Sequence, residues 1–125
     1  MIAGVGTDIV AIARLGALYD RHGQRALEKL LSPRERLEFA GARQPARFLA
    51  KRFAAKEAFG KALGIGLAAP ATLPNVAVVH DSLGRPVFEY AAPLAAYLAQ
   101  RRLVAHLSIS DEQELAVAFV IMEQA

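Results

Sequence analysis

The sequence predicts an α+β domain in which helices pack on a mainly antiparallel sheet. A segment rich in valine and isoleucine, residues 1–12, is typical of a strand. Helical spacing of apolar residues then runs through most of residues 14–63. Residues 75–90 and 104–122 each contain two strand patterns separated by a short turn, as in a hairpin. Strands joined by tight turns are antiparallel, so this order of elements gives the class.

The chain begins with the strand pattern MIAGVGTDIVAI. Gly4 and Gly6 leave room in this strand for a bulge or for the close approach of another backbone. Two brief amphipathic helices are expected next, at residues 14–23 and 24–31, and Gly23 ends the first of them.

The next two helices have clear boundaries. Ser32 followed by Pro33 and Glu35 forms a capping-box pattern, with the serine as N-cap and the proline in the first turn. A long central helix is expected over residues 45–63, ending at Gly64, because glycine readily adopts the left-handed conformation that closes a helix.

The second half of the chain alternates loops, strands and one helix. The last strand is apolar at successive positions, which is typical of a strand covered on both faces, either inside a sheet or at an interface. The expected elements are a Gly/Pro-rich loop at 64–74, strands at 75–81 and 85–90 with a turn at 82–84, a helix at 92–102, and strands at 104–110 and 114–122.

Length and composition favour one globular domain covering residues 1–125. The chain has no cysteine, which excludes disulfides, zinc-thiolate sites and thiol nucleophiles and suits a reducing compartment. Its apolar runs are shorter than the roughly 20 residues that cross a membrane. We therefore expect a cytoplasmic protein without membrane association.

Positive charge is concentrated in the first half of the chain. Residues 1–61 hold 12 of the 15 basic residues and 6 of the 12 acidic ones, a surplus of +6, whereas the rest carries −3. Such a surface attracts nucleic acid, phosphorylated small molecules or acidic proteins, and it can also be a merely solvated face.

Four charged residues of the central helix need an explanation. Arg52 and Lys56 fall within its apolar arc, where their stems can lie along apolar surface with the charge in water, or where a phosphate or neighbouring subunit can meet them. Glu57 and Lys61 have the spacing of an ordinary salt bridge on a helix surface. Gly60, however, costs a helix about 1 kcal/mol relative to alanine, which indicates that something nearby needs room.

Asp8 is unusual inside a Val/Ile strand, and a turn is the simplest explanation for it. If the fold brings it to Glu57, the two carboxylates suit Mg²⁺, which proteins often hold with one or two carboxylates and substrate phosphates. His106 lies on the polar face of its strand, where a histidine is usually structural but can donate to a phosphate. The histidines lack metal-ligand spacing, and no common nucleotide-binding or hydrolase motif is present.

Two motifs together resemble the holo-(acyl-carrier-protein) synthases, the small 4′-phosphopantetheinyl transferases. The first is the aspartate after a glycine in GVGTDIVAIARL, matched by Gly6 and Asp8. The second is W/F-A-x-K-E-A-x-x-K, matched within RFLAKRFAAKEAFGKALGIG from Phe53 to Lys61. The GRP element beginning at Gly84 and the later HLSIS also agree, so the resemblance covers essentially the whole chain.

The resemblance implies an enzyme that moves 4′-phosphopantetheine from coenzyme A to a serine of apo-acyl carrier protein, releases 3′,5′-ADP and requires Mg²⁺. It also implies a homotrimer with active sites between subunits. Such a carrier protein is acidic, which gives the basic half of the chain a partner.

The same resemblance assigns roles to individual residues. Asp8 and Glu57 would hold the metal, and Lys61 would contact the pyrophosphate. The base that deprotonates the serine is either Glu57 or a water on the metal. Around the nucleotide, the resemblance places Arg47, Arg52, Pro86 and His106. Gly64 and Gly66 would form a phosphate loop, which often reads Gly-Thr-Gly in relatives and has Ile65 in the middle here. The residues facing the carrier protein would be Arg14, Arg21 and Arg25.

Two other classes of function remain as alternatives. A small basic nucleic-acid-binding module would explain the charge, but the six Phe and three Tyr stand mostly at core-like spacing rather than where bases could stack. A non-catalytic oligomeric scaffold would keep the fold without binding coenzyme A. We expect neither, and no nucleic-acid partner.

Overall fold

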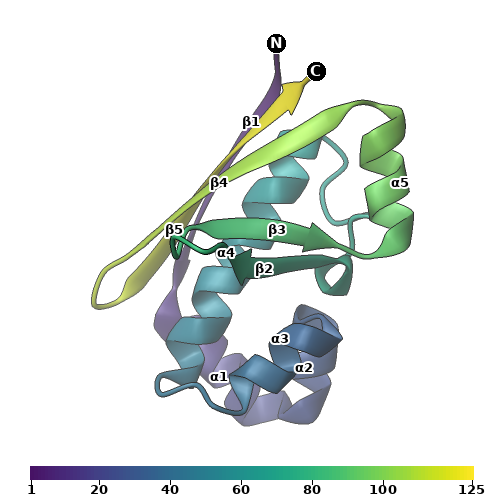
Figure 1. Cartoon of the computed structure of the whole chain (residues 1–125). Helices are drawn as coiled ribbons and strands as arrows, with labels where there is room; N and C mark the ends of the chain where they lie inside the picture. The colour runs from purple at the N-terminus through teal and green to yellow at the C-terminus, as the bar shows by residue number, and fades with distance from the viewer.

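The computed structural model describes residues 1–125 and has the predicted order of elements (Figure 1). The elements are β1 (Ile2–Ala11), α1 (Ile12–His22), α2 (Gln24–Leu30), α3 (Pro33–Phe39), α4 (Pro45–Leu63), the 3-10 turn η1 (Leu73–Asn75), β2 (Val76–His80), β3 (Pro86–Tyr90), α5 (Ala92–Gln100), β4 (Leu103–Asp111) and β5 (Leu115–Gln124).

The strands form two antiparallel sheets rather than one. A three-stranded sheet has the order β1-β5-β4, and β2 pairs with β3 in a separate hairpin. β5 is the central strand of the larger sheet, as its apolar sequence predicted. The α+β class and the antiparallel pairing are therefore confirmed, with the strands divided between two sheets.

The central helix α4 lies between the two sheets, and α1, α2 and α3 gather beyond its N-terminal half (Figure 1). Leu49, Ala54, Ala58 and Phe59 on this helix are almost fully buried. They join the inward residues of β5 and the apolar residues of β2 in a single core. α4 is thus the scaffold against which the other elements are positioned.

β1 packs directly on the backbone of α4 at its two glycines. A Cβ built on Gly4 would lie 2.0 Å from the carbonyl oxygen of Ala62, and one built on Gly6 would lie 2.0 Å from that of Ala58. The pairing with β5 is also irregular between Ile2 and Gly4. The sequence left a bulge and a close approach as alternatives, and the strand has both.

Replacing Gly6 by alanine should therefore be strongly destabilising. The new methyl group cannot be accommodated without moving β1 from α4, and we expect a loss of about 2–4 kcal/mol, in the range of severe overpacking. Gly41→Ala is the matched control, because its Cβ would meet only the carbonyl of Glu38 at 3.8 Å. Urea unfolding of both variants measures the difference. Equal midpoints would show that β1 can move away from α4 at little cost.

The two ends of the chain lie side by side at one end of the larger sheet (Figure 1). The Met1 ammonium donates to the carbonyl of Gln124 at 3.2 Å, and the Gln124 amide donates to the carbonyl of Met1 at 2.8 Å. None of the helices is both long enough and apolar enough to span a bilayer.

Candidate active site

β1 and α4 bring three of the predicted residues together. Asp8 stands on the face of β1 that meets α4, two residues after Gly6. The Lys61 ammonium donates to the carboxylate of Asp8 at 3.2 Å and to the carbonyl of Thr7 at 2.9 Å. Asp8 is therefore not in a turn, and its carboxylate is held over the C-terminal half of α4.

Glu57 lies one helical turn before Lys61 and faces the same strand. Burial raises the pKa of Glu57, and the negative charge of Asp8 raises it further, while Lys61 and Arg14 act in the opposite direction. The predicted salt bridge between Glu57 and Lys61 is not formed, because Lys61 pairs with Asp8 instead. The carboxylates of Asp8 and Glu57 thus repel each other, and the cations Lys61 and Arg14 lie near Glu57.

This donor set fits a hard divalent cation that is shared with a ligand. No cluster of three or more carboxylate or imidazole side chains is present, so the protein offers two carboxylates rather than a complete metal cage. Mg²⁺ is typically bound in this way, with substrate phosphates and water supplying the other ligands. A cation between Asp8 and Glu57 would also relieve the repulsion that raises the pKa of Glu57.

Gly60 provides the room for the loop that follows α4. A Cβ built on Gly60 would lie 2.6 Å from the carbonyl oxygen of Gly66, and the Gly66 amide donates to the carbonyl of Gly60 at 3.1 Å. Gly64 and Gly66 both have positive φ angles, 91° and 64°, which favour glycine. The loop from Gly64 to Gly66 is consequently folded back onto the helix two turns from Glu57.

Arg47 binds the turn between β4 and β5. Its guanidinium donates to Asp111 at 2.7 Å and to the carbonyls of Glu112 and Gln113 at 2.7 and 3.0 Å. Its side chain also borders a shallow hollow at the start of α4. The other cations around this hollow are Arg43, Lys51 and Arg52.

Arg52 is 93% buried, unlike an arginine whose charge reaches water along its stem. It stacks on the ring of Phe48 at 3.6 Å and contacts Glu38 at 3.4 Å and Glu35 at 3.7 Å. Its Nε atom is buried without a hydrogen-bond partner. Arg52 therefore borders the basic hollow while its charge is largely compensated inside the protein.

Lys56 differs from both explanations that the sequence offered. It is fully buried, so its charge neither reaches water nor meets a phosphate or subunit. The ammonium donates to the carboxylate of Glu35 and to the carbonyls of Leu30 and Leu73, at 2.7 and 2.9 Å for the two carbonyls. Burial lowers the pKa of Lys56, and the charge of Glu35 opposes this. Both sequence-based explanations of Lys56 were wrong, because they gave Glu35 a role only in the capping box and not as the partner of a buried lysine.

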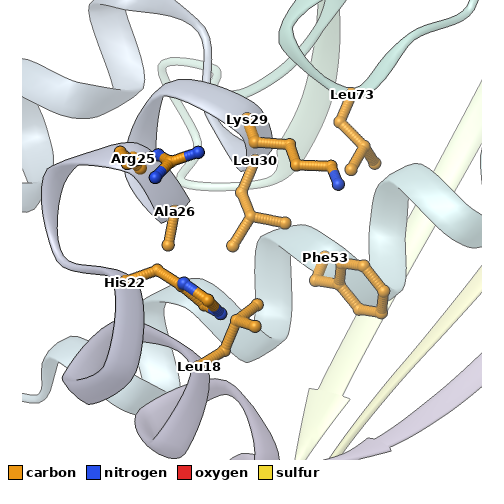
Figure 2. A pocket seen from close by; sticks show the side chains of 8 residues that line it. All are labelled: Leu18, His22, Arg25, Ala26, Lys29, Leu30, Phe53 and Leu73. Atoms are coloured by element: carbon orange, nitrogen blue, oxygen red, sulfur yellow. The ribbon is translucent and has the colours of Figure 1, made fainter.

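A pocket of about 420 Å³ opens between α1, α2, α4 and η1 (Figure 2). Its apolar side includes Phe53 from α4, and Arg25 lies on its rim. Arg14 stacks on the same phenylalanine at 5.4 Å, whereas Arg21 is exposed on α1 and does not line the pocket. The remaining lining residues are Leu18, His22, Ala26, Lys29, Leu30 and Leu73.

Pro86 and His106 are separated from the Asp8–Glu57 pair. Pro86 begins β3, and His106 lies on the exposed face of β4, where its Nε2 is 2.9 Å from a carboxylate oxygen of Glu123. This face points away from α4, whose side of the sheet carries the core. Within one chain, His106 faces away from the site, and Pro86 belongs to the smaller sheet rather than to that of Asp8.

The outer face of the larger sheet carries an uncovered apolar patch along β1 and β5. Phe119 on β5 is 44% exposed, and Val5 and Ile9 on β1 are 56% and 61% exposed. Val5 pairs with Ile121 and Ile9 with Val117, so the apolar residues of the two strands adjoin on either side of the Thr7–Phe119 pair. An exposed patch of this kind marks an interaction surface.

Sequence reasoning missed several residues that the fold places at these sites. Lys29 and His22 line the pocket, and Arg43 and Lys51 border the basic hollow. Helical spacing gave one signal, because Arg25 and Lys29 are four residues apart within the expected second helix. Their common surface with His22 could be recognised only once α1 and α2 were placed side by side.

Comparison with known proteins identifies the class. The family model of the 4′-phosphopantetheinyl transferase superfamily matches residues 4–120, and the chain belongs to this family. A curated relative from Dechloromonas aromatica, named holo-[acyl-carrier-protein] synthase, is 60% identical over 125 residues, which cover all of both chains.

Solved structures agree with this assignment. The crystal structure of holo-[acyl-carrier-protein] synthase from Neisseria meningitidis has a TM-score of 0.96 and 43% identity, and the match covers 99% of this chain and 100% of that one. The enzyme from Bacillus anthracis, in complex with CoA (3′,5′-ADP), has a TM-score of 0.85 and 32% identity, with 100% and 99% covered. The fold and the family predicted from the sequence are confirmed.

Proposed function

We propose that this chain transfers the 4′-phosphopantetheine group of coenzyme A to a serine of apo-acyl carrier protein, giving holo-acyl carrier protein and 3′,5′-ADP. The observation that carries the proposal is the convergence of Asp8, Glu57 and Lys61 at the contact of β1 with α4, in a chain that belongs to the transferase superfamily. The serine oxygen attacks the β-phosphate, and the bond from this phosphorus to the bridging oxygen breaks.

The residues of the chain have distinct tasks in this transfer. Lys61 is 53% exposed at its side chain, so its ammonium can turn from Asp8 to a pyrophosphate oxygen. Glu57 faces the same space, where its carboxylate is one of the two candidates for taking the serine proton. Arg14 adds a second positive charge near Glu57. We assign the loop at Gly64 and Gly66 to the binding of phosphate oxygens.

Mg²⁺ is the cation that this donor set fits, with Asp8 and Glu57 as its protein ligands. When bound, it would neutralise charge on the pyrophosphate and so stabilise the transition state. The 3′-phosphate of coenzyme A carries further negative charge, and its adenine is an aromatic ring. We assign them to a subsite built from Arg47 and Arg52 with, from a neighbouring subunit, Pro86 and His106.

This division of the nucleotide site requires an oligomer, and we propose a homotrimer. His106 faces away from Glu57 within one chain, on the same side of the sheet as the exposed Phe119. Packing this face against another copy would bury the patch and bring the two half-sites together. We place the enzyme in the cytoplasm, where coenzyme A and carrier proteins meet.

The carrier protein docks, in our proposal, at the pocket between α1 and α2. Arg14, Arg21 and Arg25 are exposed on these helices, and an apolar floor with a basic rim suits an acidic amphipathic helix (Figure 2). Phe53 links the pocket to α4 one turn before Glu57. The docked serine would therefore lie close to the metal site.

Charge reversal at the rim should weaken carrier binding selectively. For Arg25→Glu we expect the KM for the carrier protein to rise about 10-fold or more, chiefly through slower association, with the affinity for coenzyme A unchanged. Arg101→Glu, exposed at the C-terminal end of α5, is the matched control of equal charge change. Steady-state kinetics with each substrate varied in turn measures the effect. Equal loss of both affinities would argue against a docking surface here.

A mass measurement tests the function directly. The protein is incubated with apo-acyl carrier protein, coenzyme A and Mg²⁺, and the carrier is then weighed for the added phosphopantetheine. No mass increase with any of several carrier proteins would overturn the proposal. Salt-sensitive binding of nucleic acid in place of transfer would favour the basic binding module, and normal assembly without coenzyme A binding would favour the scaffold.

A further inference from the structure

Lys56 occupies a position that the proposed reaction does not use. It is the neighbour of Glu57 in sequence, yet its side chain leaves α4 on the opposite side from β1 and is fully buried. A lysine ammonium has three donors, and all three are satisfied, by one carboxylate and two carbonyls. Such a complete set of partners for a buried cation fixes the separation of the segments that supply them.

The two carbonyls belong to the walls of the pocket. Leu30 ends α2 and Leu73 begins η1, and both side chains line the pocket on either side of Lys29 (Figure 2). No backbone hydrogen bond joins Leu30 directly to Leu73 across the pocket. The ammonium of Lys56 therefore joins both walls to α4, at the turn of the helix that carries Phe53 and Glu57.

Glu35 extends this connection to α3 and β2. One carboxylate oxygen accepts from the Ser32 amide and from Lys56, and the other accepts from the Val78 amide at 2.9 Å. The carboxylate is fully buried and every one of these donors lies on a different segment. The pair Lys56–Glu35 is thus a polar junction of α2, α3, α4, η1 and β2.

We propose that Lys56 is a positioning residue, which holds the docking pocket at a fixed distance from Glu57 and so aligns the serine of the docked carrier protein with the pyrophosphate. This inference rests on the proposed function. Lys56 touches neither substrate. Its effect is transmitted through the carbonyls of Leu30 and Leu73, which place the pocket walls, and through the single peptide bond to Glu57.

The test removes the charges of Lys56 and Glu35 together and leaves the buried Arg52 paired with Glu38. Lys56→Met alone would leave the Glu35 carboxylate buried and unpaired, so it is combined with Glu35→Gln, whose amide oxygen can still accept from Ser32 and keep the capping box. If this protein does not fold, Lys56→Gln with Glu35→Gln retains a donor for one carbonyl and takes its place. Size-exclusion chromatography and circular dichroism establish folding first.

The expected result is a selective loss of carrier-dependent activity. We expect kcat/KM for the carrier protein to fall about 10- to 100-fold, as a displacement near 1 Å would cause, while the Kd of coenzyme A measured calorimetrically with Mg²⁺ changes less than about twofold. Leu94→Ala is the matched control, because it weakens the core at α5 without touching the pocket. When the Leu94 variant and the double variant are each assayed at the same interval below their own Tm, the Leu94 variant should keep the wild-type kcat/KM for the carrier protein and the wild-type Kd of coenzyme A.

Two outcomes would overturn the inference. If the folded double variant keeps the wild-type kcat/KM for the carrier protein, the junction only stabilises the fold. If coenzyme A binding is lost in parallel, Lys56 acts on the nucleotide instead. Both outcomes presuppose a wild-type protein that is active in the mass measurement, and an inactive wild type would overturn the proposed function itself.

Discussion

Glu57→Gln and Asp8→Asn should each lower the rate of phosphopantetheine transfer by at least about 10³-fold, since each removes one of two carboxylates that we assign to Mg²⁺. Both replacements are nearly isosteric and should leave the fold intact. Glu57→Gln should melt no lower than the wild type, because the carboxylate it removes is partly buried and is repelled by Asp8. Initial rates of holo-carrier formation and Mg²⁺-dependent binding of coenzyme A measure the effect.

Glu114→Gln is the matched control for these variants. The Glu114 carboxylate is exposed in the turn before β5, so the variant without it should retain the wild-type rate. A wild-type rate for the Glu57 or the Asp8 variant would remove that residue from the site. Loss of rate with unchanged Mg²⁺-dependent coenzyme A binding would assign Glu57 to proton transfer rather than to the metal.

Phe119→Asp should convert a trimer into monomers and abolish most of the activity. The new charge would lie in the centre of the apolar sheet face, where another copy would have to desolvate it. Because we assign Pro86 and His106 of a neighbouring subunit to the nucleotide site, separating the subunits should also remove those contacts. We expect at least about 100-fold lower kcat/KM for coenzyme A.

Size-exclusion chromatography with multi-angle light scattering measures the molar mass of the assembly. The wild type should have three times the mass of the 13.4 kDa chain, and the variant should have the mass of one chain. Leu37→Asp on α3, at a leucine that is 80% exposed and remote from the sheet, should keep both mass and activity. An active monomer of the Phe119 variant would show that the site is complete within one subunit.

Local signals in the sequence predicted most of the fold. The capping box of Ser32 and Glu35 is formed with both hydrogen bonds, and α4 ends at Gly64 in the left-handed conformation. The alternation of β4 is seen in its exposed and half-buried residues. These features depend on residues a few positions apart, which is why sequence patterns capture them.

The site depended on contacts that no local pattern contains. Asp8 and Lys61 are 53 residues apart, and only the resemblance to a family linked the two segments before the fold was known. The partner of Lys56 lies 21 residues away in a residue that already had a capping role. The division of the strands into two sheets likewise depends on how the long helix inserts between them, which strand patterns do not report.

The close contact of β1 with α4 has a consequence for the resting enzyme. Since the pKa of Glu57 is higher in the folded chain than in the unfolded one, ionising it at neutral pH lowers the free energy of unfolding. The strand does not retreat from this repulsion, because Gly4 and Gly6 hold it by backbone contact that no side-chain rotation can loosen. The repulsion between these carboxylates thus lowers stability at the place where we propose a cation site, as is common in active sites.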